Sequence, residues 1–391
     1  MTRPLLDLAT LRQERLERLR VILKQADVAG ALFLDPINIR YATDTTNMQV
    51  WCLHNPTRYV FVATEGPVIL FEFATCEHLA VGIETIDEVR PATSWTYMMA
   101  GSEAGARAAE WAAEVADIVN RSGGGNRRLA VDRLDVMGFS ALQRLGIEVA
   151  EGQELAEQAR ALKTPQELVA IRDCMVAGET SLQTMHNALH PGLSERELWS
   201  VLHQSNIALG GEWIETRLLA SGPRTNPWYQ ECSDRIIEDG DLVAIDTDMV
   251  GRHGYCCDIS RTWRTGDGQA SDAQRRTYAA AHAHLSRLIE LVGPGVTLGE
   301  IAEAVGEPPA GHEVYSCLVH GIGLCDEYPV AFWKGQSGRY DEVLRAGMTV
   351  CVESYLGPEN AAEGVKLEQQ VLITDSGVEV LNKLPLEDAW L

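Results

Sequence analysis

The sequence has no apolar run that approaches the ~20 residues needed to span a membrane. It also has no apolar core of a secretory signal peptide, because residues 11–25 are charged and periodic, as in an amphipathic surface helix. Positive charge is scarce: the formal net charge is −23 at pH 7, whereas nucleic-acid binding needs a basic surface. We therefore expect no membrane partner and no nucleic-acid partner.

Regularly spaced cysteines are absent as well. The nine cysteines include no C-x-x-C pair, and Cys256 and Cys257 are adjacent. An odd, scattered set of this kind is typical of reduced thiols in a cytoplasmic protein rather than of a disulfide framework. Low-complexity segments and solenoid repeats are also missing. These features predict a globular, cytoplasmic protein.

The length of 391 residues predicts two domains. Residues 1–155 alternate strand and helix signals, which indicates a small α/β domain. Residues 156–391 begin with a long helix after Thr164-Pro165 and contain three capping-box signatures, at Ser194, Ser271 and Thr297. Between these helices lie strand signals at residues 215–221, 241–263, 350–357 and 365–374. We expect an α+β domain in which helices back an antiparallel sheet.

Residues 241–263 carry the first candidate site. An apolar run leads into Asp246-Thr247-Asp248, a glycine-containing turn follows, and a second β-prone run carries Asp258. This pattern predicts an antiparallel hairpin with Asp246 and Asp248 on one face of a strand. Isolated acids of this kind usually lie on a solvated face, but here the flanking residues are apolar. Three carboxylates in such surroundings need a cation, which favours a metal site.

The C-terminal half supplies three further candidate ligands. His320 lies in Val-His-Gly-Ile-Gly, and Glu353 and Glu368 each lie in an apolar strand segment. Taken singly, each has an ordinary structural explanation, as a core histidine or a strand-end acid. Taken together with the three aspartates, they form a plausible dinuclear metal site with bridging carboxylates.

The order Asp, Asp, His-Gly-Ile-Gly, Glu, Glu resembles that of the pita-bread metallopeptidase family, which includes proline dipeptidases, methionine aminopeptidase and the metal-free creatinase. The resemblance covers nearly the whole chain. It implies a creatinase-like N-terminal domain before a C-terminal pita-bread domain. It also implies that five residues bind two metal ions: Asp246, Asp258, His320, Glu353 and Glu368.

The chain departs from the peptidases of this family at three points. Asp248 stands where the peptidases usually have glycine, and Trp228-Tyr229 stands where they have a His-Tyr pair. An indole N–H is only a donor and cannot replace a histidine that transfers protons. The second histidine after the His-Gly-x-Gly motif is replaced by Asp326. The metal ligands are therefore present, while both accessory histidines of peptide hydrolysis are missing.

One subgroup of the family, the dimethylsulfoniopropionate lyases of the DddP type, resembles this chain in these features. The shared motifs are Asp-x-Asp, Cys-Asp-Ile-Ser at residues 257–260 and the segment 320–329. The resemblance implies six metal ligands, Asp246, Asp248, Asp258, His320, Glu353 and Glu368. It implies that Asp326 is the general base and that Tyr315 holds the substrate. A tryptophan of the N-terminal domain is also implicated, and Trp51 is the candidate.

The chemistry of such a lyase fits these residues. A metal that binds the substrate carboxylate stabilises the charge formed on deprotonation, and a carboxylate base in a dry pocket removes the proton. Dimethyl sulfide then leaves, and acrylate remains. Aromatic faces attract a sulfonium cation, so Tyr315, Trp51, Trp228 and Tyr229 are candidate contacts for it. Trp51, Trp228 and Tyr229 can equally be packing residues. The resemblance implies iron and a homodimer; the ligand types also accept manganese, zinc or cobalt.

Two other functions stay open. A metallopeptidase of the proline-dipeptidase type is favoured by the overall fold and the five retained ligands. The other is a protein that binds onium-type osmolytes and keeps a structural metal. It would use the same aromatic residues for binding but would catalyse no reaction. A metal-free amidinohydrolase of the creatinase type is disfavoured, because every metal-ligand type is present.

Overall fold

The computed structural model describes residues 5–336, 342–387 and 390–391. The chain divides into two compact units, which are described separately. The N-terminal unit runs to Arg160 and includes Thr164–Gln166, and the C-terminal unit comprises Ala161–Lys163 and Glu167–Leu391. The domain boundary predicted between residues 155 and 156 falls inside helix α7 (Gln153–Ala161), whereas the units divide at the end of that helix.

The N-terminal unit is built on one mixed sheet of order β4-β3-β2-β1-β5-β6. Its strands are β1 (Gly30–Phe33), β2 (Tyr59–Ala63), β3 (Val68–Glu72), β4 (Glu88–Pro91), β5 (Arg128–Val131) and β6 (Glu148–Glu151). Its helices are α1 (Leu8–Gln25), α2 (Pro36–Thr43), α3 (Gln49–Cys52), α4 (Tyr97–Ala100), α5 (Ala104–Ser122), α6 (Val136–Arg144) and α7, with 3₁₀ turns η1 (Glu77–Ala80) and η2 (Gly101–Glu103).

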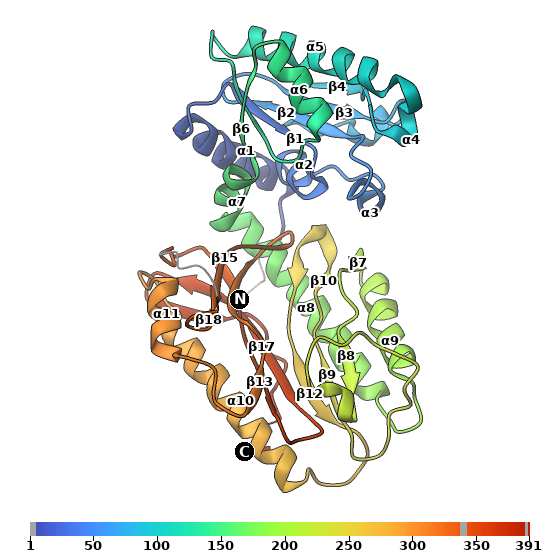
Figure 1. Ribbon diagram of the computed structural model, residues 1–391, viewed down its shortest axis with the longest axis vertical. Coiled ribbons are helices and arrows are strands. Elements are labelled where there is room, and N and C mark those ends of the chain that lie inside the picture. The colour runs from blue at the N-terminus through green and yellow to red at the C-terminus, as the bar shows by residue number, and fades with distance from the viewer. Residues whose placement is uncertain (1–4, 337–341, 388–389) are drawn as a thin grey trace. The chain divides into compact units, whose positions relative to one another are not determined.

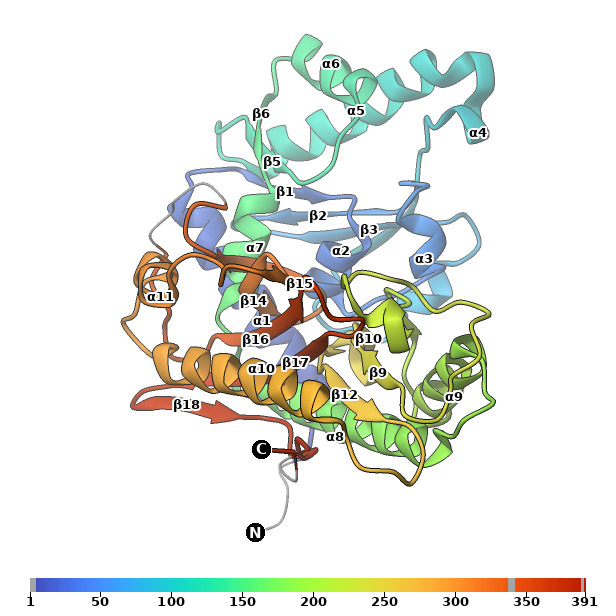
Figure 2. The same cartoon turned by 60° about the horizontal axis from the view of Figure 1, so that its bottom comes forward.

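The core of this unit lies between the sheet and helices α5 and α6. Trp111 of α5 and Leu142 of α6 are fully buried against Phe61 and Phe71 of the sheet. Figure 2 shows α5 and α6 over one face of the sheet and α1 and α2 over the other. Strands β2 and β3 form an antiparallel pair. Strand β1 runs parallel to β5, which gives the mixed α/β sheet expected from the alternating elements.

The C-terminal unit contains three sheets and four α-helices among its described residues. The helices are α8 (Pro165–Ala188), α9 (Glu195–Ala208), α10 (Asp272–Leu291) and α11 (Leu298–Val305), with 3₁₀ turns η3 (Gly222–Thr225) and η4 (Arg252–Gly254). The strands are β7 (Trp213–Ile214), β8 (Leu219–Ser221), β9 (Leu242–Ile245), β10 (Met249–Val250), β11 (Cys256–Cys257), β12 (Arg261–Arg264), β13 (His312–Val314), β14 (Cys317–Ile322), β15 (Asp326–Phe332), β16 (Thr349–Pro358), β17 (Val365–Thr374) and β18 (Gly377–Val380).

Two small sheets have the orders β11-β10-β7 and β12-β9-β8, and the large sheet has the order β15-β14-β16-β17-β18 with β13 paired to β16. Every pairing in these sheets is antiparallel. Helix α10 lies along the large sheet (Figure 1), where Tyr278 and Leu285 are buried with Val350 and Val371. On α8, a side chain at Gly178 would collide with Cys257, so this helix lies directly against β11. The predicted α+β domain, with helices against antiparallel strands, is confirmed.

The local signals for helix starts are confirmed. Ser194, Ser271 and Thr297 each form a complete capping box at the start of α9, α10 and α11. The strand predicted at residues 215–221 was too long, because regular pairing is limited to β7 and β8 on either side of residues 215–218. In the described part of the chain, no helix is both long enough and apolar enough to cross a lipid bilayer.

Candidate metal centre

The first part of the candidate site is an interrupted hairpin. Strand β9 pairs antiparallel with β12, and β10 pairs antiparallel with β11, which confirms the predicted return of the chain. The pairing is broken between these two ladders, at residues 246–248 on one side and 258–260 on the other. Thr247 bridges the break: its hydroxyl donates to the carbonyl of Cys257 at 3.0 Å and accepts from the amide of Ile259 at 2.9 Å.

The three aspartates meet in this break. Asp246, Asp248 and Asp258 offer carboxylate oxygens that all lie within 4.8 Å of one another. The predicted reason, a regular strand that places residues i and i+2 on one face, is wrong, because Asp248 has a positive φ of 36°. The Thr216 hydroxyl donates to Asp248 Oδ2 at 2.6 Å, and the amide of Asp248 donates to Asp258 Oδ1 at 3.2 Å. The carboxylates therefore converge because the ladder opens there.

The large sheet contributes the other three predicted ligands. His320 lies on β14, Glu353 on β16 and Glu368 on β17, and all three are buried. Glu353 and Glu368 are direct cross-strand partners in the β16–β17 ladder. Like charges in such a pair destabilise a sheet unless a cation lies between or beside them. The three sheets of the unit thus converge on one set of acidic side chains.

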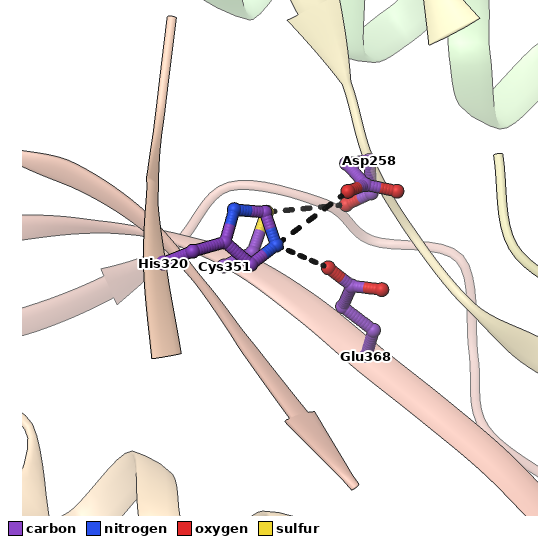
Figure 3. A group of neighbouring side chains, drawn as sticks. All are labelled: Asp258, His320, Cys351 and Glu368. Atoms are coloured by element: carbon purple, nitrogen blue, oxygen red, sulfur yellow. Dashed lines mark hydrogen bonds and ion pairs between the residues drawn. The ribbon is translucent and has the colours of Figure 1, made fainter. Parts of the chain in front are cut away.

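His320 is oriented with one ring nitrogen toward the carboxylates (Figure 3). Its Nε2 lies 3.7 Å from Asp258 Oδ2, 3.6 Å from Glu353 Oε1 and 3.6 Å from Glu368 Oε1. Its Nδ1 lies 3.1 Å from the carbonyl oxygen of Gly321, which accepts a hydrogen bond from Nδ1–H. That bond leaves Nε2 directed at the acids, and Nε2 is the nitrogen through which this histidine could bind a metal once it has lost its proton.

Lys366 is a member of the site that was not identified from the sequence. Its ammonium donates to Asp246 Oδ2 at 3.0 Å, Glu353 Oε2 at 2.8 Å and Glu368 Oε2 at 3.0 Å, and it also contacts the Ser260 hydroxyl at 2.8 Å. The side chain is fully buried. Burial alone would lower the pKa of Lys366, but the carboxylates raise it well above its ordinary value. The site therefore contains one permanent positive charge.

The remaining acceptors fit a divalent metal. Among the described residues, Glu353 Oε1 and Glu368 Oε1 are buried and have no hydrogen-bond partner. Buried carboxylate oxygens without a donor are costly, and a cation satisfies them. Groups of side chains that can hold a cation are Asp258, His320, Cys351 and Glu368; Asp246, Asp248 and Asp258; and Asp246, Glu353 and Glu368, the last of which surrounds the Lys366 ammonium.

The charges of the site are strongly coupled. Burial is the largest cause that raises the pKa of Asp246, Asp248 and Asp258, and repulsion from neighbouring carboxylates adds to it. Burial likewise raises the pKa of Glu353 to about 7, against the opposing effect of Lys366. Glu368 differs: burial raises its pKa, but Lys366 and His320 together lower it well below the ordinary value. The cluster thus contains more acid than its own cations neutralise.

Asp326, the predicted base, is the first residue of β15. Its Oδ1 lies 3.6 Å from His320 Nδ1, whereas Asp258, Glu353 and Glu368 lie near the other ring nitrogen, Nε2. Its side chain is 55% exposed, so it is more open to solvent than the dry pocket expected from the sequence. It therefore stands at the solvent-facing margin of the acidic cluster.

The aromatic candidates have different surroundings. Tyr315 is half-buried, and its hydroxyl lies 3.2 Å from that of Tyr229, which is 62% exposed. The Lys366 ammonium lies 5.4 Å from the centre of the Tyr315 ring and 5.9 Å from that of Trp228. Trp228 is buried and stacks on Tyr355 at 5.9 Å. Tyr315 and Trp228 thus adjoin the acidic cluster, and only Tyr229 of the three is mainly exposed.

Trp51 belongs to the N-terminal unit. It lies in the short helix α3, and its ring meets Phe73 edge-on at 5.7 Å. The Asn47 side chain, which precedes this helix, donates to the buried Glu72 at 3.1 Å. Its predicted contact with substrate stays a prediction.

The residues that were missed in the sequence carry a common signal. Lys366, Cys351 and Ser260 each lie two positions from a predicted ligand, namely Glu368, Glu353 and Asp258. Residues i and i+2 of a strand share a face, so the alternation along β16 and β17 would have found the lysine and the cysteine. A lysine inside an apolar strand, two positions from an acid, was the clearest of these signals.

The sequence is similar to known families over both units. Residues 15–162 match the creatinase/prolidase N-terminal domain, and residues 169–375 match metallopeptidase family M24. The dimethylsulfoniopropionate lyase DddP of Roseovarius nubinhibens is 41% identical over 98% of this chain and 88% of its own length. The enzyme of the same name from Roseobacter denitrificans is 39% identical over the same shares.

Solved structures agree on the fold. The prolidase from Pyrococcus horikoshii superposes with a TM-score of 0.76 over 96% of this chain and 99% of the prolidase, at 21% identity. Enzymes of family M24 use divalent metals, and the acidic cluster of this chain has the donors for them. The chain belongs to metallopeptidase family M24 and, within it, to the group of the DddP dimethylsulfoniopropionate lyases.

Proposed function

We propose that this protein is a metal-dependent lyase that converts dimethylsulfoniopropionate into dimethyl sulfide and acrylate. The observation that carries the proposal is the carboxylate of Asp326, 3.6 Å from His320 at the margin of the acidic cluster. A carboxylate there can accept a proton from a substrate bound beside the cluster. The relatives that cover almost the whole chain at 41% and 39% identity are named as lyases of this substrate.

The metal ligands in this proposal are the six predicted residues, with Asp246, Asp248, Asp258, His320, Glu353 and Glu368 around two divalent ions. The unpartnered oxygens of Glu353 and Glu368 support this assignment. When bound, such ions supply electrostatic stabilisation of the negative charge that develops on the substrate carboxylate. Iron is the proposed metal, since the ligand set accepts it, and manganese, zinc and cobalt are the alternatives.

The residues of the chain supply the proton transfer. Asp326 takes a proton from the carbon next to the substrate carboxylate, and the electron pair of that C–H bond forms the new C=C bond. The C–S bond breaks, and dimethyl sulfide leaves with its bonding pair as a neutral molecule. Because the side chain of Asp326 is 55% exposed, it can return the proton to water after each turnover. No water nucleophile is consumed, which fits the replacement of both accessory histidines.

The sulfonium group is proposed to contact the aromatic side chains. The Tyr229 face is exposed, and its hydroxyl adjoins that of Tyr315. Aromatic faces attract onium cations by about 1–2 kcal/mol when partly desolvated. Burial raises the pKa of Tyr315, so its hydroxyl stays protonated and can donate a hydrogen bond. Trp228 and Trp51 are further proposed substrate contacts. The proposed enzyme is a homodimer in the cytoplasm.

A direct assay tests the proposal. The metal-loaded protein is incubated with dimethylsulfoniopropionate, and dimethyl sulfide is measured in the headspace while acrylate is measured in solution. Equimolar release of both products is the expected result. Release no faster than in a control without enzyme, at confirmed metal occupancy, contradicts the proposed function.

The Asp326→Asn variant tests the role of the base. The amide cannot accept the proton, so kcat should fall by about 10²- to 10⁴-fold, the usual contribution of a general base. Metal content, measured by elemental analysis, should equal that of the wild type, because Asp326 is not among the proposed ligands. Near-normal turnover in this variant would show that the base is another residue.

A dipeptidase of the prolidase type is the second candidate. The retained ligands and the superposition on a prolidase favour it. The buried Trp228, which stands in the position of a peptidase histidine, opposes it, because an indole cannot relay a proton. Chelator-sensitive hydrolysis of Xaa-Pro dipeptides, faster than release of dimethyl sulfide, would make this candidate the better one.

A further inference from the structure

A second buried charge pair lies beside the site, on the strand that carries Asp326. Lys163 donates from Nζ to Glu327 Oε1, and the two side chains are 1% and 0% exposed. Glu327 directly follows Asp326 on β15, so the two acids point to opposite faces of the strand. One acid is therefore fixed in the interior while its neighbour stands at the margin of the metal centre.

The glycines of the His-Gly-Ile-Gly segment leave room for this pair. A side chain at Gly323 would begin 2.5 Å from Glu327 Oε1 and 3.1 Å from Lys163 Cε. A side chain at Gly321 would begin 2.4 Å from the carbonyl oxygen of Tyr328. The contact at Gly321 is with the backbone, so only glycine fits there, whereas a side chain at Gly323 would require the end of the Glu327 side chain to shift. The two glycines after His320 thus allow residues 327 and 328, which follow Asp326, to pack closely against them.

Backbone hydrogen bonds also fix Lys163 and the turn between β14 and β15. The Lys163 amide donates to the carbonyl of Gly347 at 2.8 Å, so the lysine backbone is fixed within the C-terminal unit. The amide of Cys256 donates to the carbonyl of Gly323 at 2.8 Å, and Thr349 Oγ1 donates to the carbonyl of Ile322 at 2.6 Å. The turn between β14 and β15 is therefore held from several sides, and the ion pair is its anchor next to Asp326.

We propose that the buried Lys163–Glu327 ion pair is a positioning device that sets where the Asp326 carboxylate meets His320 and the metal centre. Lys163 and Glu327 touch no reacting atom in this account. They fix the first residues of β15, and through the backbone they fix the side chain one position earlier. A displacement of a catalytic group by about 1 Å can cost about 100-fold in rate. The proposal rests on the proposed function, in which Asp326 is the base.

The test uses the full-length, metal-loaded protein. The double variant Lys163→Met/Glu327→Gln removes both charges of the pair at nearly constant volume, so neither charge of the pair is left buried without the other. We expect kcat to fall about 10- to 100-fold, with KM within about threefold and metal content unchanged. Lys334→Met is the matched control, because the Lys334–Glu303 pair of the same unit is half exposed, at 48% and 51%. It should retain wild-type kinetics.

A crystal structure of the double variant separates this proposal from the proposed function. We expect the Asp326 carboxylate to move away from His320, whether or not the wild type releases dimethyl sulfide. An Asp326 carboxylate in its original position, or an unchanged kcat in a wild type that is active, overturns the proposal. An inactive wild type contradicts the proposed function alone.

If the double variant does not fold, Gly323→Ala and Glu327→Gln replace it. The alanine Cβ would press on Glu327 Oε1, and the glutamine keeps the shape of the side chain while it removes the charge. The same selective loss of kcat and the same displacement of Asp326 are expected in at least one of them. Both variants with wild-type kcat and an unmoved Asp326 overturn the proposal.

Discussion

The two units each bury acidic side chains, but they satisfy them differently. In the N-terminal unit, Glu72 accepts from Arg58 Nε at 2.7 Å, from Asn47 Nδ2 at 3.1 Å and from the amide of Phe73 at 2.8 Å. Both of its oxygens are therefore bonded. In the C-terminal unit, Glu353 and Glu368 share one ammonium on their Oε2 atoms, and their Oε1 atoms are without a hydrogen-bond partner in the described part of the chain.

This difference separates a structural acid from a candidate ligand. Burial and an opposite charge occur in both units, so neither property identifies the metal centre. The distinguishing property is the presence of buried carboxylate oxygens that accept no hydrogen bond, at a place where several carboxylates converge. Both oxygens of Glu72 accept hydrogen bonds, whereas one oxygen each of Glu353 and Glu368 is left to interact with a cation.

Removal of Lys366 should cause the largest loss of stability among the variants that test this difference between the units. In Lys366→Met, three buried carboxylates lose their ammonium, and the metal-free protein should be destabilised by about 3–5 kcal/mol. Urea denaturation with chelator present measures the change, and the exposed Lys334→Met serves as the control. An unchanged free energy of unfolding would mean that Lys366 does not stabilise the acids.

Arg58→Met makes the acid of the N-terminal unit resemble those of the metal centre. Glu72 then lies buried without its guanidinium, which should cost about 3 kcal/mol, at the lower end of the same range because only one carboxylate is exposed to the change. Added metal should not restore this loss, since one acid forms no chelating group. Denaturation curves with and without metal measure the free energy of unfolding. Full recovery of this stability on addition of metal would contradict the proposed difference between the two units.

Loss of a proposed ligand should weaken metal binding, whereas loss of a surface acid should not. Glu368→Gln removes the acid that belongs to two of the candidate cation groups. Metal affinity should fall about 100-fold, or about 2.7 kcal/mol at 1.36 kcal/mol per factor of ten. Competition with a chromophoric chelator measures the affinity. Glu379→Gln is the control, because Glu379 pairs with Arg172 at the surface, and equal losses in both variants would contradict the assignment.

The smallest expected effect is a pH dependence of metal binding. Burial raises the pKa of Glu353 to about 7 in the metal-free protein, so below that pH a bound proton competes with the metal. Affinity should be highest above pH 7 and fall by up to about tenfold, or about 1.4 kcal/mol, for each unit below it. Calorimetry at pH 6 in buffers of different ionisation enthalpy should detect proton release on binding. No release would contradict this titration.

Local signals allowed much of this architecture to be predicted. Capping boxes gave the starts of α9, α10 and α11, because they depend on residues three positions apart. Apolar runs gave β16 and β17, but not the register that places Glu353 opposite Glu368, because register depends on distant segments. The positive φ of Asp248 has no counterpart in the strand pattern. Lys366 could have been predicted, because strand alternation places it on the same face of β17 as Glu368.

The break in the hairpin at residues 246–248 has a mechanical consequence. Asp246 follows β9 of one small sheet, Asp258 follows β11 of the other, and Glu368 belongs to the large sheet. Cations bound by the groups Asp246, Asp248, Asp258 and Asp258, His320, Cys351, Glu368 would share Asp258. They would connect the three sheets in addition to the hydrogen bonds that already join them, from the Cys256 amide to the Gly323 carbonyl and from the Glu368 amide to the Ser260 carbonyl. Metal loading should then make the C-terminal unit unfold more cooperatively, with slower amide exchange along β9, β11 and β17 together.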